Sequence, residues 1–140
     1  ALCWLGGSSI YARGVKPDGE AWRLGFRDPK EEESVSLASF EIRDAVFCTS
    51  GGYERYFEQD GVRYHHIINP DTLMPWDTYD SVSILCDDSA RADALSTAVF
   101  NMDPEAGLGF VEAQEDVEAL WVFPDGTEMQ SSGFQAYMSQ

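Results

Sequence analysis

Polar and apolar residues alternate along most of the first half of the chain, a pattern typical of β-strands. Residues 8–14 and 21–28 lie on either side of the sequence VKPDGE, whose Pro-Asp-Gly run is a turn signal, so these strands are predicted to form a hairpin. Residues 34–50 predict two further strands joined near positions 43–44. The charged segment 28–33 is expected to be a solvated loop.

A second hairpin is predicted over residues 53–68, because two alternating runs meet at Gln59-Asp60-Gly61. Residues 69–80 contain two prolines and no periodicity, and are therefore expected to form a loop. Residues 81–88 predict another strand, and residues 117–132 predict a third hairpin around a second Pro-Asp-Gly turn.

Apolar residues recur at helical spacing in the segment 87–102, which opens with acidic residues and a serine suited to a helix N-terminus. Residues 103–114 predict a short helix with Pro104 in its first turn, and residues 133–140 a short terminal helix. Hairpins followed by helices indicate an α+β fold, a mainly antiparallel sheet with helices packed on one face. We expect one domain over residues 1–140.

The composition indicates a folded globule, with 44% hydrophobic and 13% aromatic residues. The 25 acidic and 9 basic residues give a net charge of −16, which disfavours nucleic acid and anionic membrane surfaces as partners. A phosphorylated ligand would need local donors or a cation. No apolar run approaches the roughly 20 residues of a membrane helix. The chain does not open on Met, so we expect it to begin inside a longer protein, with any targeting segment upstream.

Three cysteines are far apart and form no CxxC motif, so neither a zinc site nor a disulfide framework is indicated. We expect buried free thiols, although one pair could bridge; the three are Cys3, Cys48 and Cys86. The four tryptophans are expected in the core or in a lid rather than stacked on a ligand, and Trp76 is the one that falls in the irregular loop.

Asp93 and Thr97 lie four residues apart in the predicted helix 87–102, which places them one turn apart on one face. A carboxylate and a hydroxyl are hard oxygen donors that suit Mg²⁺, which commonly keeps waters and takes phosphate oxygens from a substrate. The alternative is that Asp93 caps the helix start and Thr97 bonds back to a carbonyl one turn earlier.

His65 and His66 are the two histidines, adjacent in a predicted strand, so their side chains should point to opposite faces. One of them could donate to a phosphate or act as an acid or base, and the alternative is a structural role. Two glycine-rich stretches are further candidates for ligand contact. Ser50-Gly51-Gly52 could present backbone N–H groups or form a plain turn, and residues 5–9 favour a glycine bulge over ligand contact.

In combination these motifs resemble the C-terminal half of the FAD:protein FMN transferase family, also called the ApbE family. The resemblance covers nearly the whole chain and rests on four stretches in order, which are LGGSSIYARGVKPDGEAWRLGFRDP, TSGGYERYFEQDGVRYHHIINPDT, SVSILCDDSARADALSTAVF and EALWVFPDGTEMQSSGF. It implies an ApbE-like fold related to the T-fold. The chain departs from the family in residues 69–73, where Asn-Pro-Asp-Thr-Leu replaces an Asp-Pro-Arg/Lys-Thr-Gly run.

The resemblance implies a Mg²⁺-dependent enzyme that cleaves FAD and passes FMN to a Thr or Ser of a target protein, releasing AMP. Hydrolysis of FAD to FMN and AMP is a second activity that it implies. The metal ligands would be Asp93 and Thr97, and His66 would be the catalytic residue, assisting proton transfer. The residues expected to contact the flavin cofactor are Ser50, Gly51, Tyr53, His66, Ile67 and Thr72.

The expected partners are FAD and a flavin-acceptor protein. Because the N-terminal half of the family lies outside these residues, the alternative function is a non-catalytic flavin-binding or interaction domain. A homo-oligomer that rebuilds the missing half is a further possibility. The resemblance implies a periplasmic lipoprotein at the cell envelope, with cytoplasmic forms as the alternative.

Overall fold

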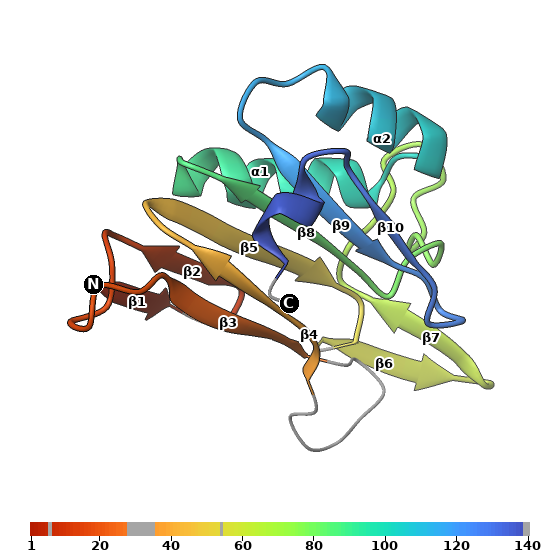
Figure 1. Cartoon of the computed structure of the whole chain (residues 1–140). Coiled ribbons are helices and arrows are strands. Elements are labelled where there is room, and N and C mark those ends of the chain that lie inside the picture. Colours follow the sequence, from red (N-terminus) through yellow and green to blue (C-terminus); the bar gives the residue numbers. More distant parts are fainter. Residues whose placement is uncertain (6, 28–35, 54, 139–140) are drawn as a thin grey trace.

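A six-stranded antiparallel sheet runs through the middle of the molecule (Figure 1). The computed structural model describes residues 1–5, 7–27, 36–53 and 55–138. The sheet has the order β1-β2-β5-β8-β9-β10, and every neighbouring pair is antiparallel. Its strands are β1 (Leu2–Leu5), β2 (Ser9–Ala12), β5 (Ala45–Gly51), β8 (Ser81–Cys86), β9 (Glu118–Val122) and β10 (Glu128–Gln130).

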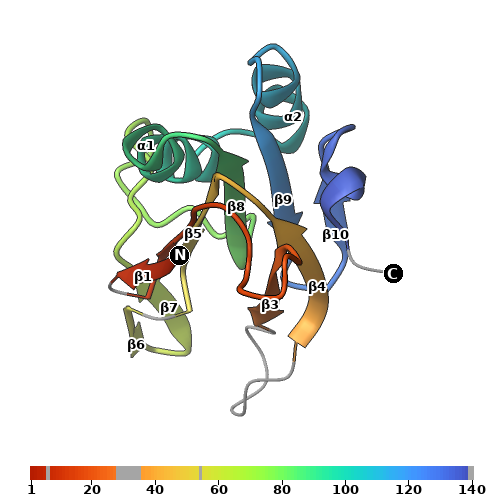
Figure 2. The same ribbon diagram turned by 60° about the vertical axis from the view of Figure 1, so that its left-hand side comes forward.

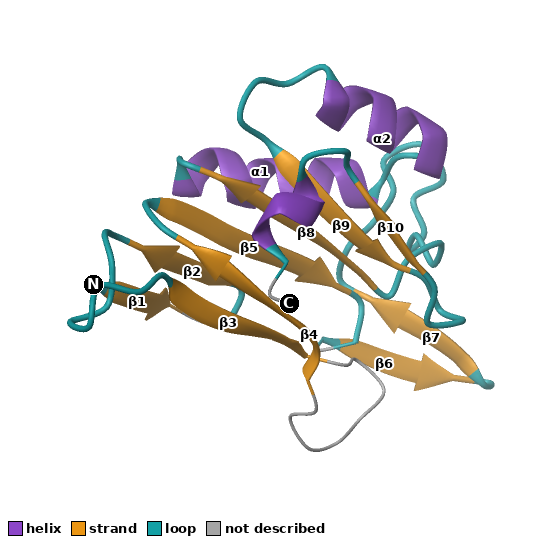
Figure 3. Cartoon of the chain, viewed as in Figure 1, coloured by secondary structure: helices purple, strands orange, loops and turns teal. Residues whose placement is uncertain are grey.

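The two faces of this sheet carry different covering layers (Figures 2 and 3). On one face lie the helices α1 (Ser89–Phe100) and α2 (Pro104–Glu112). On the other lie the two-stranded sheet of β3 (Trp22–Arg27) and β4 (Ser36–Ile42), and the 3₁₀ helix η1 (Phe134–Tyr137). The predicted α+β fold, with a mainly antiparallel sheet and helices on one face, is confirmed.

The central strands are buried on both faces, because alternate side chains enter two separate cores. In β5, Val46 and Cys48 pack in the cluster beneath the helices, whereas Ala45 and Phe47 pack in the cluster beneath β3 and β4. β8 is buried at all six positions. This double burial makes β5 and β8 a rigid base for side chains at their surface.

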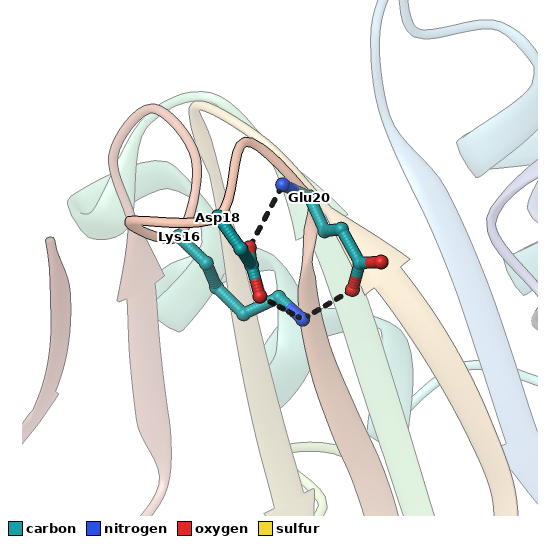
Figure 4. Close-up of polar contacts among 3 residues, drawn as sticks. All are labelled: Lys16, Asp18 and Glu20. Atoms are coloured by element: carbon teal, nitrogen blue, oxygen red, sulfur yellow. Dashed lines mark hydrogen bonds and ion pairs between the residues drawn. The ribbon is translucent and has the colours of Figure 1, made fainter.

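The turn over residues 15–20 forms as predicted, but the hairpin does not (Figure 4). Lys16 donates its backbone N–H to the Glu20 carbonyl at 2.8 Å, and its ammonium lies 2.8 Å from Glu20 Oε2 and 3.7 Å from Asp18 Oδ2. Yet β2 pairs with β1 and β5, and β3 pairs with β4. A turn signal fixes a local reversal but not the pairing partner, so here the turn carries the chain from one sheet to another.

The other predicted elements are confirmed where the structure describes them. β6 (Tyr56–Gln59) and β7 (Val62–His65) form the predicted hairpin, with Asp60 and Gly61 at φ 54° and 78°, as a tight two-residue turn requires. β9 and β10 form the third predicted hairpin. The predicted loop 28–33 lies outside the described residues.

Some expectations about burial were wrong. Cys3 is exposed, whereas Cys48 and Cys86 are buried, and all three are free thiols. Trp4 is 69% exposed, because β1 lies at the edge of the sheet, whereas Trp121 is fully buried. In the part of the chain that the structure describes, no helix has the length and apolar character needed to cross a bilayer.

Candidate functional site

A cavity of about 170 Å³ lies where α1, the end of β5, the β1–β2 turn and the start of the loop after β7 meet. Every residue predicted from the sequence to form a site lines this cavity, except Ile67 and Thr72. The described lining residues are Gly7, Ser8, Thr49, Ser50, Gly51, Tyr53, Arg55, His66, Asp93 and Thr97. Residues far apart in the sequence therefore meet at one place.

Helix α1 presents Asp93 and Thr97 to the cavity from successive turns, and both side chains are exposed. The N-cap of this helix is Asp88, whose Oδ1 accepts the Arg91 N–H at 2.8 Å. The alternative in which Asp93 caps the helix is therefore wrong. The Thr97 hydroxyl lies 3.1 Å from Ser50 Oγ on β5.

A layer of buried polar groups lies beneath these two residues. Ser96 is fully buried, donates to the Asp93 carbonyl at 3.0 Å, and lies 2.8 Å from Ser50 Oγ. Cys48 donates from Sγ to Asp93 Oδ1 at 3.5 Å and lies 3.2 Å from Ser9 Oγ. Burial raises the pKa of the Cys48 thiol, so it stays protonated and acts as a donor.

The two histidines point to opposite faces, as predicted. His65 is buried, and its Nδ1 accepts the Ile67 N–H at 3.2 Å. Its Nε2 lies 3.1 Å from the Trp76 carbonyl, which can only accept, so Nε2 carries the proton. Burial lowers the pKa of His65, which favours this neutral form. His65 is thus a structural residue, and His66 is the histidine that lines the cavity.

The turn after β5 lies close against aromatic side chains. A Cβ added to Gly51 would lie 2.5 Å from Cε1 of Tyr53, and one added to Gly52 would lie 2.7 Å from Cδ2 of His65. Only glycine allows these two rings to approach the backbone so closely. The two glycines therefore set the positions of Tyr53 at the cavity and of His65 behind it.

Ile67 and Thr72 lie apart from the cavity lining. Ile67 is buried in the core beneath the helices, and Thr72 is exposed in the loop after β7. In this loop Asn69 Oδ1 accepts the N–H groups of Asp71 and Thr72 at 2.9 and 3.1 Å. The contact of Ile67 and Thr72 with the flavin stays a prediction.

Four of the described lining residues were not assigned from the sequence, namely Gly7, Ser8, Thr49 and Arg55. Arg55 lies just before β6 and lines the cavity, although no motif marked it. Gly7 and Ser8 come from the β1–β2 turn, where ligand contact was the less favoured interpretation. Gly7 has φ 89°, and the Ser8 carbonyl accepts the Thr49 N–H at 2.9 Å, which ties this turn to β5.

The cavity offers donors for a phosphate and oxygen ligands for a hard cation. Arg55 can donate to phosphate oxygens, whereas Asp93 and Thr97 supply a carboxylate and a hydroxyl oxygen. Among the described residues, no group of three or more His, Cys, Asp or Glu side chains could hold a metal. A carboxylate with hydroxyls suits Mg²⁺, which usually binds one or two carboxylates, waters and substrate phosphates.

The chain is similar to proteins of one family. The model of the ApbE family matches residues 1–121. The FAD:protein FMN transferase of Treponema pallidum is 42% identical over 142 residues, an alignment that covers 95% of this chain and 39% of that protein. The Vibrio cholerae protein of the same name is 35% identical over 137 residues, which cover 96% of this chain and 41% of that protein.

Solved structures show the same fold. The ApbE protein of Thermotoga maritima matches with a TM-score of 0.85 and 32% identity, covering 96% of this chain and 43% of that one. The flavin transferase ApbE of Vibrio cholerae matches with a TM-score of 0.79 and 34% identity, covering 97% of this chain and 43% of that one. The chain thus spans roughly two-fifths of the length of these relatives.

Proposed function

Because this chain belongs to the ApbE family, we propose that it forms part of a Mg²⁺-dependent enzyme that transfers FMN from FAD to a protein. The enzyme would cleave the pyrophosphate of FAD, attach FMN to a Thr or Ser hydroxyl and release AMP. One observation carries this proposal. Asp93 and Thr97 from α1 share a single cavity with His66 and Arg55, so cation ligands, a base and an anion-binding group lie together.

The metal would be held by Asp93 and Thr97. Both are oxygen donors at the cavity, and Thr97 already has the Ser50 hydroxyl beside it at 3.1 Å. When bound, Mg²⁺ supplies Lewis-acid polarisation of a phosphoryl oxygen and offsets the charge of the pyrophosphate. A bound cation also explains how a chain of net charge −16 could accept such a ligand.

His66 would accept the proton of the attacking hydroxyl. The hydroxyl oxygen forms a bond to the phosphorus on the FMN side of FAD, and the bond from that phosphorus to the AMP oxygen breaks. The proton passes to Nε2 of His66, since Nδ1 lies 3.3 Å from the Arg55 carbonyl and can only donate to it. With water as the nucleophile, the same steps give FMN and AMP.

The remaining lining residues would bind FAD. The Arg55 guanidinium can pair with phosphate oxygens, while the Tyr53 ring and the backbone at Gly51 form one wall of the cavity. We propose that this chain is the C-terminal portion that the resemblance implies. The rest of a family-length protein would then supply further contacts to FAD.

The experiment that tests this function measures AMP released from FAD, with and without Mg²⁺, by liquid chromatography. We expect AMP only with Mg²⁺, and loss of release in Asp93→Ala but not in Glu105→Ala, which removes an exposed carboxylate of α2. Retention of FAD with no AMP release would support a non-catalytic flavin-binding domain instead. Release that is unchanged in Asp93→Ala would contradict the assignment of the site.

A further inference from the structure

A row of three hydroxyls connects the interior of α1 to the cavity. Ser96 is fully buried, its Oγ lies 2.8 Å from Ser50 Oγ, and Ser50 Oγ lies 3.1 Å from Thr97 Oγ1. The proposed function uses Thr97 at one end of the row and assigns no role to Ser96 at the other. A buried polar side chain needs its partners, so this row has a defined hydrogen-bond pattern.

The direction of the protons follows from one fixed contact. Ser96 Oγ lies 3.0 Å from the Asp93 carbonyl, which can only accept, so the single proton of Ser96 is directed there. Ser96 must then accept from Ser50 at the next contact. Since the proton of Ser50 is used in this way, Ser50 accepts from Thr97.

This hydrogen-bond pattern sets the orientation of the Thr97 hydroxyl. Its proton is directed toward Ser50 on β5, so its lone pairs are left for the cavity that it lines. A hydroxyl binds a cation through a lone pair, and a proton pointing at the cation would oppose binding. We propose that Ser96 is a positioning residue, which acts through Ser50 to orient the Thr97 hydroxyl for Mg²⁺. This inference rests on the proposed function.

The carboxylate of Asp93 also receives a hydrogen bond from a side chain of β5. The Cys48 thiol directs its proton to Asp93 Oδ1 at 3.5 Å, so at the contact of 3.2 Å with Ser9 it is the Ser9 hydroxyl that donates. Both proposed Mg²⁺ ligands are therefore supported by groups of the sheet. Groups that orient metal ligands in this manner change metal affinity without touching the ion.

The test is a calorimetric titration of this chain with Mg²⁺ alone, comparing the parent with Ser96→Ala. We expect Mg²⁺ affinity to fall about tenfold, because the Ser50 proton is freed to turn toward Thr97. Ser83→Ala is the matched control. Ser83 is also fully buried in the sheet and lies 2.8 Å from the hydroxyl of another lining residue, Thr49, but it lies outside the row. We expect Ser83→Ala to retain the parent affinity.

A double variant separates orientation from a general loosening of α1. Ser50→Ala breaks the row between Ser96 and Thr97, so adding Ser96→Ala should weaken Mg²⁺ binding no further. If Ser96→Ala lowers Mg²⁺ affinity by the same factor in Ser50→Ala as in the parent, Ser96 acts by another route, and the proposal is overturned.

The proposed function has its own control in the same titration. Loss of Mg²⁺ binding in Asp93→Ala together with unchanged binding in Ser96→Ala would overturn the role of Ser96 alone. Unchanged Mg²⁺ binding in Asp93→Ala, or no binding by the parent, would overturn the metal site and the role of Ser96 with it.

Discussion

The Nδ1 atom of His66 lies 3.3 Å from the carbonyl oxygen of Arg55, and the His66 backbone N–H lies 3.2 Å from the same oxygen. A carbonyl cannot donate, so Nδ1 carries a proton in this contact, and in the neutral imidazole Nε2 then has the lone pair. An imidazole in this tautomer, at the edge of a cavity, is arranged to accept a proton.

His66→Asn tests this role. An asparagine amide can still donate to the Arg55 carbonyl but cannot act as a base near neutral pH. We expect the rate of AMP release to fall by roughly a hundredfold or more, the usual contribution of a general base. FAD affinity should change little, because the side chain remains polar. A variant that keeps the parent rate would show that His66 does not accept the proton.

Arg55→Gln tests the anion-binding role of the guanidinium. Loss of a charge-assisted hydrogen bond should weaken FAD binding by about tenfold, and the remaining binding should depend less on salt. Arg63→Gln is the matched control, since Arg63 lies on β7 over the ring of Tyr56, 4.4 Å from its centroid, and is not a described lining residue. Equal FAD affinities for the two variants would contradict a role for Arg55 in FAD binding.

Gly52→Ala should destabilise the fold. The new Cβ would lie 2.7 Å from the His65 ring, which is itself held at both nitrogens, so the free energy of unfolding should fall by about 1–3 kcal/mol. Gly109→Ala makes the same chemical change in α2, where the added Cβ meets nothing within 4 Å. It should instead stabilise the chain by about 0.5–1 kcal/mol. Urea denaturation of both variants measures the contrast.

Leu73→Gly should stabilise the loop after β7. Leu73 has φ 57° and is 75% exposed, so it adopts a left-handed conformation with little burial in return. Relief of this strain exceeds the added entropy of glycine in the unfolded chain, and we expect a gain of about 0.5 kcal/mol. Leu73→Ala keeps the strain and should show no such gain. Thermal unfolding of the two variants gives the comparison, and a gain with alanine alone would contradict it.

The local elements could be predicted because their signals are local. Asp60-Gly61 marks a tight turn, and the apolar spacing of α1 marks a helix, whatever the rest of the chain does. The pairing of β2 could not be predicted, because the contacts of Ser9 with Cys48 and of Ala12 with Ala45 join distant segments. The exposure of Cys3 and Trp4 likewise follows from the position of β1 at a sheet edge.

Only those residues of the site that belong to a sequence motif could be predicted. Asp93 and Thr97 follow from helical spacing, and their assignment with His66 and Ser50 came from resemblance to a family. Arg55 could not be found in this way, because no motif marks it. It reaches the cavity through the turn between β5 and β6. Ser96 belongs to no motif that marks a site, and its link to Thr97 needs the three-dimensional position of Ser50.

Calorimetric titration of this chain with FAD, with and without Mg²⁺, shows for the parent and for Asp93→Ala whether FAD binds through a cation at this carboxylate. We expect Mg²⁺ to strengthen FAD binding by the parent and to have no effect on Asp93→Ala, because this carboxylate would hold the cation that offsets the charge of the pyrophosphate. The proposed metal site is contradicted if the parent binds FAD equally well with and without Mg²⁺. It is also contradicted if Mg²⁺ still strengthens FAD binding by Asp93→Ala.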